Sequence, residues 1–131
     1  MVNWFIYIFF VFFLILFFVY VFGNRETIDI NDLEIDSEYS FFNNSQGKTA
    51  YYSIGDDSSE PLILIHGVTV PSHYYKKIAT SLSEIGYKVY VYDHFGRGFS
   101  DRPKIKYNMH NYRNQLNDFI NHLSLDNVTL M

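Results

Sequence analysis

Residues 61–68 read PLILIHGV, a continuous apolar run that ends at His66 and Gly67. A strand without polar alternation must be covered on both faces, as strands of parallel sheets are. Two further runs fit this description, YKVYVY at residues 87–92 and VTLM at residues 128–131. The sequence therefore predicts three parallel strands with helices on both faces of the sheet.

The segments between these strands have the period of amphipathic helices. Apolar residues recur at helical spacing at Tyr75, Ile78, Ala79, Leu82 and Ile85, and again at Tyr112, Leu116, Phe119, Ile120 and Leu123. We expect Ser72 to cap the first helix and Gly86 to end it. The alternation of strands and helices predicts an α/β fold, a three-layer sheet with right-handed crossovers.

Two short segments rich in aromatic residues precede this unit. Residues 39–42 and 49–54 are separated by the turn-forming sequence NNSQG, which predicts a hairpin. The Asn43-Asn44-Ser45 pattern in this turn is an acceptor for glycosylation if the domain faces a lumen, and otherwise an ordinary loop sequence. We assign residues 38–131 to one domain.

Residues 4–22 are all apolar or aromatic and would span roughly 28 Å as a helix, close to the thickness of a hydrocarbon core. We predict a transmembrane helix that acts as a signal anchor, which makes the protein a single-pass membrane protein. A cleaved signal peptide is the alternative, although signal peptides normally begin with basic residues and have shorter apolar stretches. Arg25 is the one basic residue nearby, so the membrane orientation stays open. Residues 24–37 are polar and acidic, and we interpret them as a stalk.

The charges of the chain exclude several classes of function. The sequence has 10 Lys and Arg against 14 Asp and Glu, without a dense run of basic residues. Binding to a phosphate backbone needs such a run, so we expect no nucleic-acid partner. The absence of cysteine excludes disulfides and thiolate metal sites, and the histidines lack metal-ligand spacing. We predict no metal site.

The sequence GRGFSD at residues 96–101 begins like a dinucleotide-binding glycine loop. Asp101 stands where the third glycine would be, and Arg102-Pro103 follow in place of a helix that could bind a pyrophosphate at its N-terminus. We therefore do not expect a nucleotide.

Taken in order, these motifs resemble the α/β-hydrolase family. A strand, His66-Gly67, a helix, a second strand, Asp93 and the sequence GRGFSDRP at residues 96–103 follow the arrangement of that family. The chain is most similar to the esterase and lipase branch that includes monoacylglycerol lipases. The resemblance implies an ester or lipid substrate and a serine mechanism that needs no cofactor.

The resemblance also implies roles for residues at the ends of the first two strands. Ester hydrolysis by serine forms an oxyanion that needs backbone N–H donors, and in the family one donor is the residue after His-Gly, here Val68. Gly67 and His66 are expected to support that loop. A structural role in the second loop, rather than a catalytic one, is expected for Asp93, Gly96, Arg97, Gly98, Ser100 and Asp101, with Arg97 paired to a carboxylate.

The chain contains no nucleophile elbow, G-x-S-x-G, so no catalytic residue is predicted within it. We expect the nucleophile just after Met131 and regard residues 38–131 as a truncated α/β-hydrolase domain that is inactive alone. The complete protein is predicted to be a membrane-anchored serine hydrolase of the carboxylic-ester or lipase type. The alternatives are a non-catalytic membrane-anchored interaction protein or pseudo-enzyme, and a nonfunctional remnant.

Overall fold

The computed structural model describes residues 4–23 and 38–131, which belong to two separate units. In the first unit, helix α1 (Trp4–Gly23) has no buried residue. This helix is long and apolar enough to cross a membrane, although a signal sequence would meet the same criteria. The helix predicted at residues 4–22 is thus present, whereas the stalk predicted at residues 24–37 lies outside the described residues.

The second unit is built on a mixed five-stranded sheet with the strand order β1-β2-β4-β3-β5. The strands are β1 (Ser40–Asn43), β2 (Lys48–Ile54), β3 (Glu60–Ile65), β4 (Tyr87–Tyr92) and β5 (Thr129–Leu130). β1 and β2 form an antiparallel hairpin, and β2 pairs antiparallel with β4. β3 lies between β4 and β5 and is parallel to both. The predicted hairpin and the three parallel strands are confirmed.

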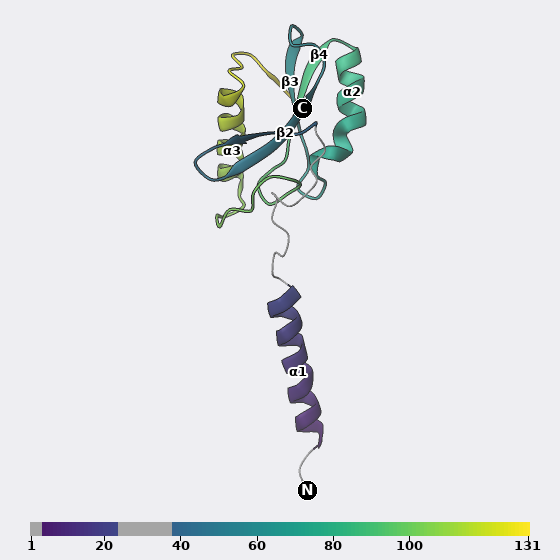
Figure 1. Ribbon diagram of the computed structural model, residues 1–131, viewed down its shortest axis with the longest axis vertical. Coiled ribbons are helices and arrows are strands. Elements are labelled where there is room, and N and C mark those ends of the chain that lie inside the picture. Colours follow the sequence, from purple (N-terminus) through teal and green to yellow (C-terminus); the bar gives the residue numbers. More distant parts are fainter. Residues whose placement is uncertain (1–3, 24–37) are drawn as a thin grey trace. The chain divides into compact units, whose positions relative to one another are not determined.

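Two helices cover the two faces of this sheet (Figure 1). Helix α2 (Lys76–Glu84), preceded by the short 3-10 helix η2 (Ser72–Tyr75), joins β3 to β4, and α3 (Met109–His122) joins β4 to β5. Successive residues of β3 point to opposite faces, so Leu62 packs with Ala79 of α2 while Ile63 packs with Phe119 of α3. The α/β fold with three layers is confirmed.

The first helix differs from its prediction in two respects. Ser72 does not cap α2, because it begins η2 and its backbone N–H donates to the Asp93 carboxylate; α2 starts four residues later. Ile78 and Ile85, expected in the core, are 48% and 72% exposed, since α2 presents only a narrow row of side chains to the sheet. The end of the helix is as predicted, with Gly86 following it at φ +103°.

The connections that leave β3 and β4 lead to opposite faces of the sheet. The chain moves from β3 to β4 and then returns past β3 to β5, and right-handed crossovers place the two helices on opposite faces when the direction reverses. In open α/β sheets, ligands bind outside the carboxyl ends of the strands at such a point. The loops at residues 66–71 and 93–101 begin there.

Candidate active site

The first loop is held in place by its first residue, His66, which is only 2% exposed. Its Nε2 atom accepts a hydrogen bond from the backbone N–H of His94 at 2.9 Å, and its Nδ1 atom lies 2.7 Å from the carbonyl oxygen of Gly67. Because Nε2 is an acceptor, the ring proton is on Nδ1 and is donated to Gly67. Nε2 also lies 3.8 Å from the Asp93 carboxylate, but it has no proton to share with it. His66 therefore braces the loop through hydrogen bonds at both of its ring nitrogens.

The peptide group between Gly67 and Val68 is fixed on its carbonyl side. Its oxygen accepts hydrogen bonds from His66 and, at 3.3 Å, from the N–H of Val70. In a trans peptide the N–H points away from the carbonyl oxygen, and this peptide is trans. Within residues 38–131, no acceptor is bound to the N–H of Val68, and Val68 is 56% exposed. This N–H is therefore available to an oxygen atom of a ligand.

The second loop is tied together by buried polar side chains. The carboxylate of Asp93, which is fully buried, accepts the N–H of Ser72 at 2.9 Å and the N–H of Phe99 at 3.1 Å. The hydroxyl of Ser100, also fully buried, donates to the Asp93 carbonyl at 2.6 Å and accepts the N–H of Ala50 at 2.9 Å. Ala50 in turn accepts the N–H of Asp93, so strand β2 holds the loop directly.

Gly98 and Asp101 complete this loop. A Cβ atom on Gly98 would lie 2.1 to 2.3 Å from the carboxylate atoms of Asp93, and Gly98 has φ +46°. The carboxylate of Asp101 accepts the N–H of Lys48 at 2.7 Å, and the backbone carbonyl of Asp101 accepts the N–H of Gly96 at 2.9 Å. The acidic side chains of the loop are therefore engaged with backbone N–H groups.

Arg97 is placed differently from the sequence prediction. Its Nε donates to the carbonyl of Val68, and its Nη1 donates to its neighbour Gly96 at 2.9 Å. In the described part of the chain no ion pair involves Arg97, so the expected pairing with a carboxylate is wrong. The nearby carboxylates of Asp93 and Asp101 already accept backbone N–H groups. Arg97 instead connects the second loop to the first.

His94 is the other titratable side chain of the second loop. Its ring lies 4.5 Å from that of His66 and 4.7 Å from that of Tyr112, measured between ring centroids. Burial lowers the pKa of His94 to about 4, and the neighbouring His66 adds to this effect. Its Nδ1 atom has no hydrogen-bond partner among the described residues. His94 is thus a neutral imidazole at pH 7.

Two adjoining pockets of about 570 and 540 Å³ open beside these loops. Val68, Met109 and Tyr112 line both pockets, Arg97 and Arg102 line the first, and Ile65, His94, Arg113 and Leu116 line the second. No carboxylate is among the lining residues. The candidate site is therefore a cleft with apolar walls and basic groups, into which the Val68 loop is exposed. Across residues 4–23 and 38–131, no three His, Asp or Glu side chains are grouped to hold a metal ion.

Two contributors to the site were not predicted from the sequence. Gln115 of α3 is fully buried, accepts the N–H of Phe95 at 3.1 Å and donates to the Asp93 carbonyl at 3.1 Å. Its position four residues before Phe119, on the apolar face of the helix, was a signal for such a role. Tyr75, expected only as an apolar residue, accepts the N–H of Gly67 with its hydroxyl at 3.2 Å.

The sequence of this chain is similar to those of several known proteins. A family model described as the alpha/beta hydrolase fold matches residues 60–131, more than half of the chain. A haloalkane dehalogenase of Psychrobacter cryohalolentis is 26% identical over 107 residues, which are 78% of this chain and 35% of the relative. A proline iminopeptidase of Clostridium botulinum is 32% identical over 89 residues, 64% of this chain and 30% of the relative.

The fold of this chain is also similar to those of solved protein structures. The crystal structure of a bromoperoxidase from Bacillus anthracis is 29% identical and superposes with a TM-score of 0.63, covering 70% of this chain and 33% of the bromoperoxidase. The chain thus spans about a third of the length of the relatives and structures that it matches. Their names cover several reactions, so the resemblance does not select one substrate.

Proposed function

Because the chain belongs to the α/β-hydrolase family, we propose that it supplies one half of the active site of a membrane-anchored serine hydrolase for carboxylic esters. In this proposal the N–H of Val68 is one of the two donors that bind the oxyanion. Gly67 and His66 position that donor, and Asp93, Gly96, Arg97, Gly98, Ser100 and Asp101 shape the neighbouring loop.

One observation carries this assignment. The Gly67–Val68 peptide is held through its carbonyl oxygen while its N–H stays without an acceptor among residues 38–131, beside a cleft with apolar walls. A donor that is fixed in advance stabilises a developing negative charge without reorganisation during the reaction. The apolar walls suit the acyl chain of an ester or a lipid.

The remaining parts of the proposal come from the sequence. The chain has no G-x-S-x-G sequence, and we propose that the nucleophile follows Met131 in the complete protein. Helix α1 would anchor the protein in a membrane, which would bring the cleft within reach of lipid substrates. The second candidate function is a non-catalytic membrane-anchored interaction protein.

A serine-directed fluorophosphonate probe distinguishes the two functions. Antibodies against residues 38–131 are used to isolate the native protein from cells treated with the probe. A labelled product heavier than the 15.5 kDa of this chain supports the hydrolase. An unlabelled product of 15.5 kDa contradicts it and favours the interaction protein.

In the labelled product, Val68→Pro tests the oxyanion donor, because proline has no N–H. We expect its turnover of a short acyl ester to fall at least about 100-fold, the usual effect of losing one such donor. Val68→Ala keeps the N–H and should retain turnover within about threefold. Equal activity of the two variants, with equal melting temperatures, would remove Val68 from the mechanism.

A further inference from the structure

Two sequences in the domain match the acceptor pattern for N-glycosylation, Asn-x-Ser/Thr with x other than proline. They are NNS at residues 43–45 and NVT at residues 127–129. The domain contains eight asparagines, and the other six lack a serine or threonine two residues later. An N-linked sugar is bulky and has to remain in solvent, so the position of each asparagine in the fold decides whether it is suited to carry one.

The six asparagines outside the acceptor pattern are engaged in the fold. Four of them have side chains that hydrogen bond to other residues of the domain, namely Asn44, Asn108, Asn111 and Asn114. The remaining two, Asn117 and Asn121, lie within helix α3. None of these six combines a free side chain with a position outside a helix.

Asn43 and Asn127 are placed differently. Asn43 is the last residue of β1, which is an edge strand, and Asn127 lies in the connection between α3 and β5. Both are exposed, and neither side chain has a hydrogen-bond partner within residues 38–131. The hydroxyl residues of the two patterns, Ser45 and Thr129, are exposed as well. The sequence pattern and the fold therefore select the same two of the eight asparagines.

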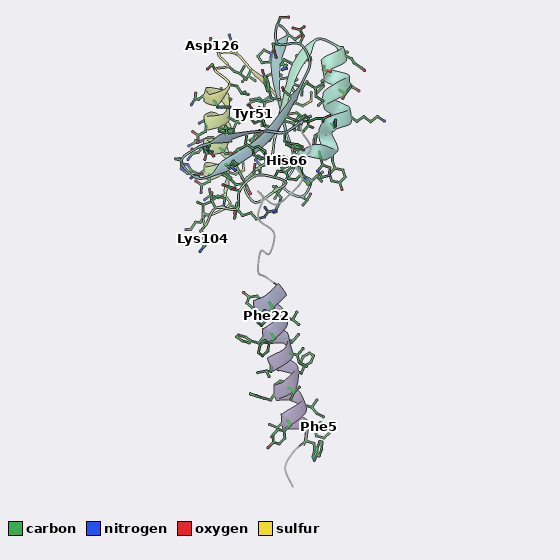
Figure 2. All side chains as sticks on the ribbon, viewed as in Figure 1. Phe5, Phe22, Tyr51, His66, Lys104 and Asp126 are labelled. Carbon is green, nitrogen blue, oxygen red and sulfur yellow. The ribbon has the colours of Figure 1, made fainter. Side chains whose placement is uncertain are left out.

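Both positions are remote from the cleft. Asn43 lines a separate pocket of about 410 Å³ beside the end of α3, and no residue of this pocket lines the two pockets of the cleft. Asn127 lies at the edge of the sheet where the parallel strands begin, whereas the loops of the cleft lie where they end. Figure 2 shows Asp126, the residue before Asn127, at the opposite end of the domain from Lys104, which follows the loop at residues 93–101. Sugars at both positions would leave the cleft open.

We propose that Asn43 and Asn127 carry N-linked sugars and that the domain lies on the lumenal or external side of the membrane. In the transfer, the amide nitrogen of the asparagine side chain attacks the anomeric carbon of a sugar that is linked to a lipid diphosphate. The new C–N bond replaces the C–O bond to the phosphate, a proton leaves the nitrogen, and the lipid diphosphate is released. The inference rests on the membrane segment of the proposed function, because α1 has to bring the domain to the lumen.

Both interpretations of α1 are compatible with this location. A signal anchor with its C-terminal side in the lumen and a cleaved signal peptide each translocate the residues that follow them. Arg25 alone does not determine the orientation. The two acceptor sites thus supply the orientation that the residues flanking the helix leave open.

Translation of the full chain with endoplasmic-reticulum microsomes tests the proposal. Glycosylation is measured by gel mobility before and after treatment with peptide-N-glycosidase. We expect two steps of reduced mobility that the enzyme removes. Ser45→Ala and Thr129→Ala should each lose one step, and the double variant should lose both, because each substitution deletes the hydroxyl that the acceptor pattern requires.

Matched variants assign the loss to the acceptor pattern. Ser45→Thr and Thr129→Ser keep a hydroxyl at each position and should keep both steps. Thr80→Ala removes an exposed hydroxyl outside the two patterns and should also keep both. A step that survives Ser45→Ala or Thr129→Ala would overturn the assignment of that site. Equal mobility of the unaltered chain with and without the enzyme would overturn the whole proposal.

Protease digestion of the sealed microsomes separates failure of the inference from failure of the membrane segment. A domain that is protected but carries no sugar overturns the inference and leaves the segment intact. A membrane-bound chain whose domain is digested does the same, because the domain then faces the cytosol. A chain that does not associate with the microsomes overturns both. A glycosylated chain that alkaline washing releases supports the inference and overturns only the anchor.

Discussion

The two loops beside the cleft are built in opposite ways. The loop at residues 93–101 contains fully buried Asp93 and Ser100, whose side chains bind backbone groups of three different segments. The loop at residues 66–71 is exposed from Gly67 to Val70, and its contacts come from His66, Tyr75 and Arg97.

The loop at residues 93–101 is therefore stabilised by its own hydrogen bonds, whereas the loop at residues 66–71 has a backbone N–H that a ligand can bind. Buried polar side chains hold one loop in place, and eight of its nine backbone N–H groups donate to acceptors within residues 38–131, Gly98 being the exception. The other loop keeps a free N–H at Val68 and depends on its neighbours for position. We infer that the loop at residues 93–101 is the rigid support on which the loop at residues 66–71 is mounted.

The substitution Gly98→Ala is expected to have the largest effect on stability, and it tests the rigidity of the loop at residues 93–101. The new methyl group would overlap the Asp93 carboxylate and would occupy a backbone conformation that L-residues rarely adopt. We expect the free energy of unfolding to fall by about 3 kcal/mol, measured by native-state hydrogen exchange of the full chain. Gly86→Ala is the control, because its φ is also positive but nothing lies within 4 Å, and it should lose only about 1 kcal/mol. Equal losses would show that the contact with Asp93 contributes nothing.

The second test is the pH dependence that arises from His94. Its pKa is about 4 in the folded protein and 6.5 ordinarily, so the unfolded chain binds the proton more readily. The stabilisation is complete above pH 6.5 and is lost as the pH falls toward 4, by an amount on the order of 2 kcal/mol. The measurement is the stability of the full chain between pH 7 and pH 4, compared with that of His94→Gln. Parallel curves for the two proteins would contradict the prediction.

The smallest effect on stability is expected for Arg97→Ala, which removes the connection from the rigid loop to the exposed one. Amide exchange at Gly67 and Val70 should accelerate about fivefold, because the first loop opens more easily. The free energy of global unfolding should change by less than about 0.5 kcal/mol, as is usual for an exposed residue. A decrease in the free energy of unfolding by more than about 1 kcal/mol would mean that the two loops unfold as one unit. It would contradict the distinction between a rigid loop and a loop that depends on it.

The sequence predicts those elements whose residues are determined by their immediate neighbours. The strand at residues 87–92 has the predicted bounds because it is a run of Tyr and Val, interrupted only by Lys88, that follows Gly86. The partners of Ser72 and Arg97 were predicted wrongly, because the atoms that they contact lie more than twenty residues away in the chain. The residues that neighbour Ser72 and Arg97 in the sequence give no indication of these distant partners.

The bonds from strand β2 to the second loop have a consequence for biosynthesis. Lys48 and Ala50 bind the backbone or side chains of Asp93, Ser100 and Asp101, some fifty residues later in the chain. Residues 48–50 are synthesised before residues 93–101, so the strand that binds the loop is already present in the chain when the loop emerges. A circular permutation that moved the β1–β2 hairpin to the C-terminus would reverse this order. Strand β2 would then be synthesised after the loop that it binds.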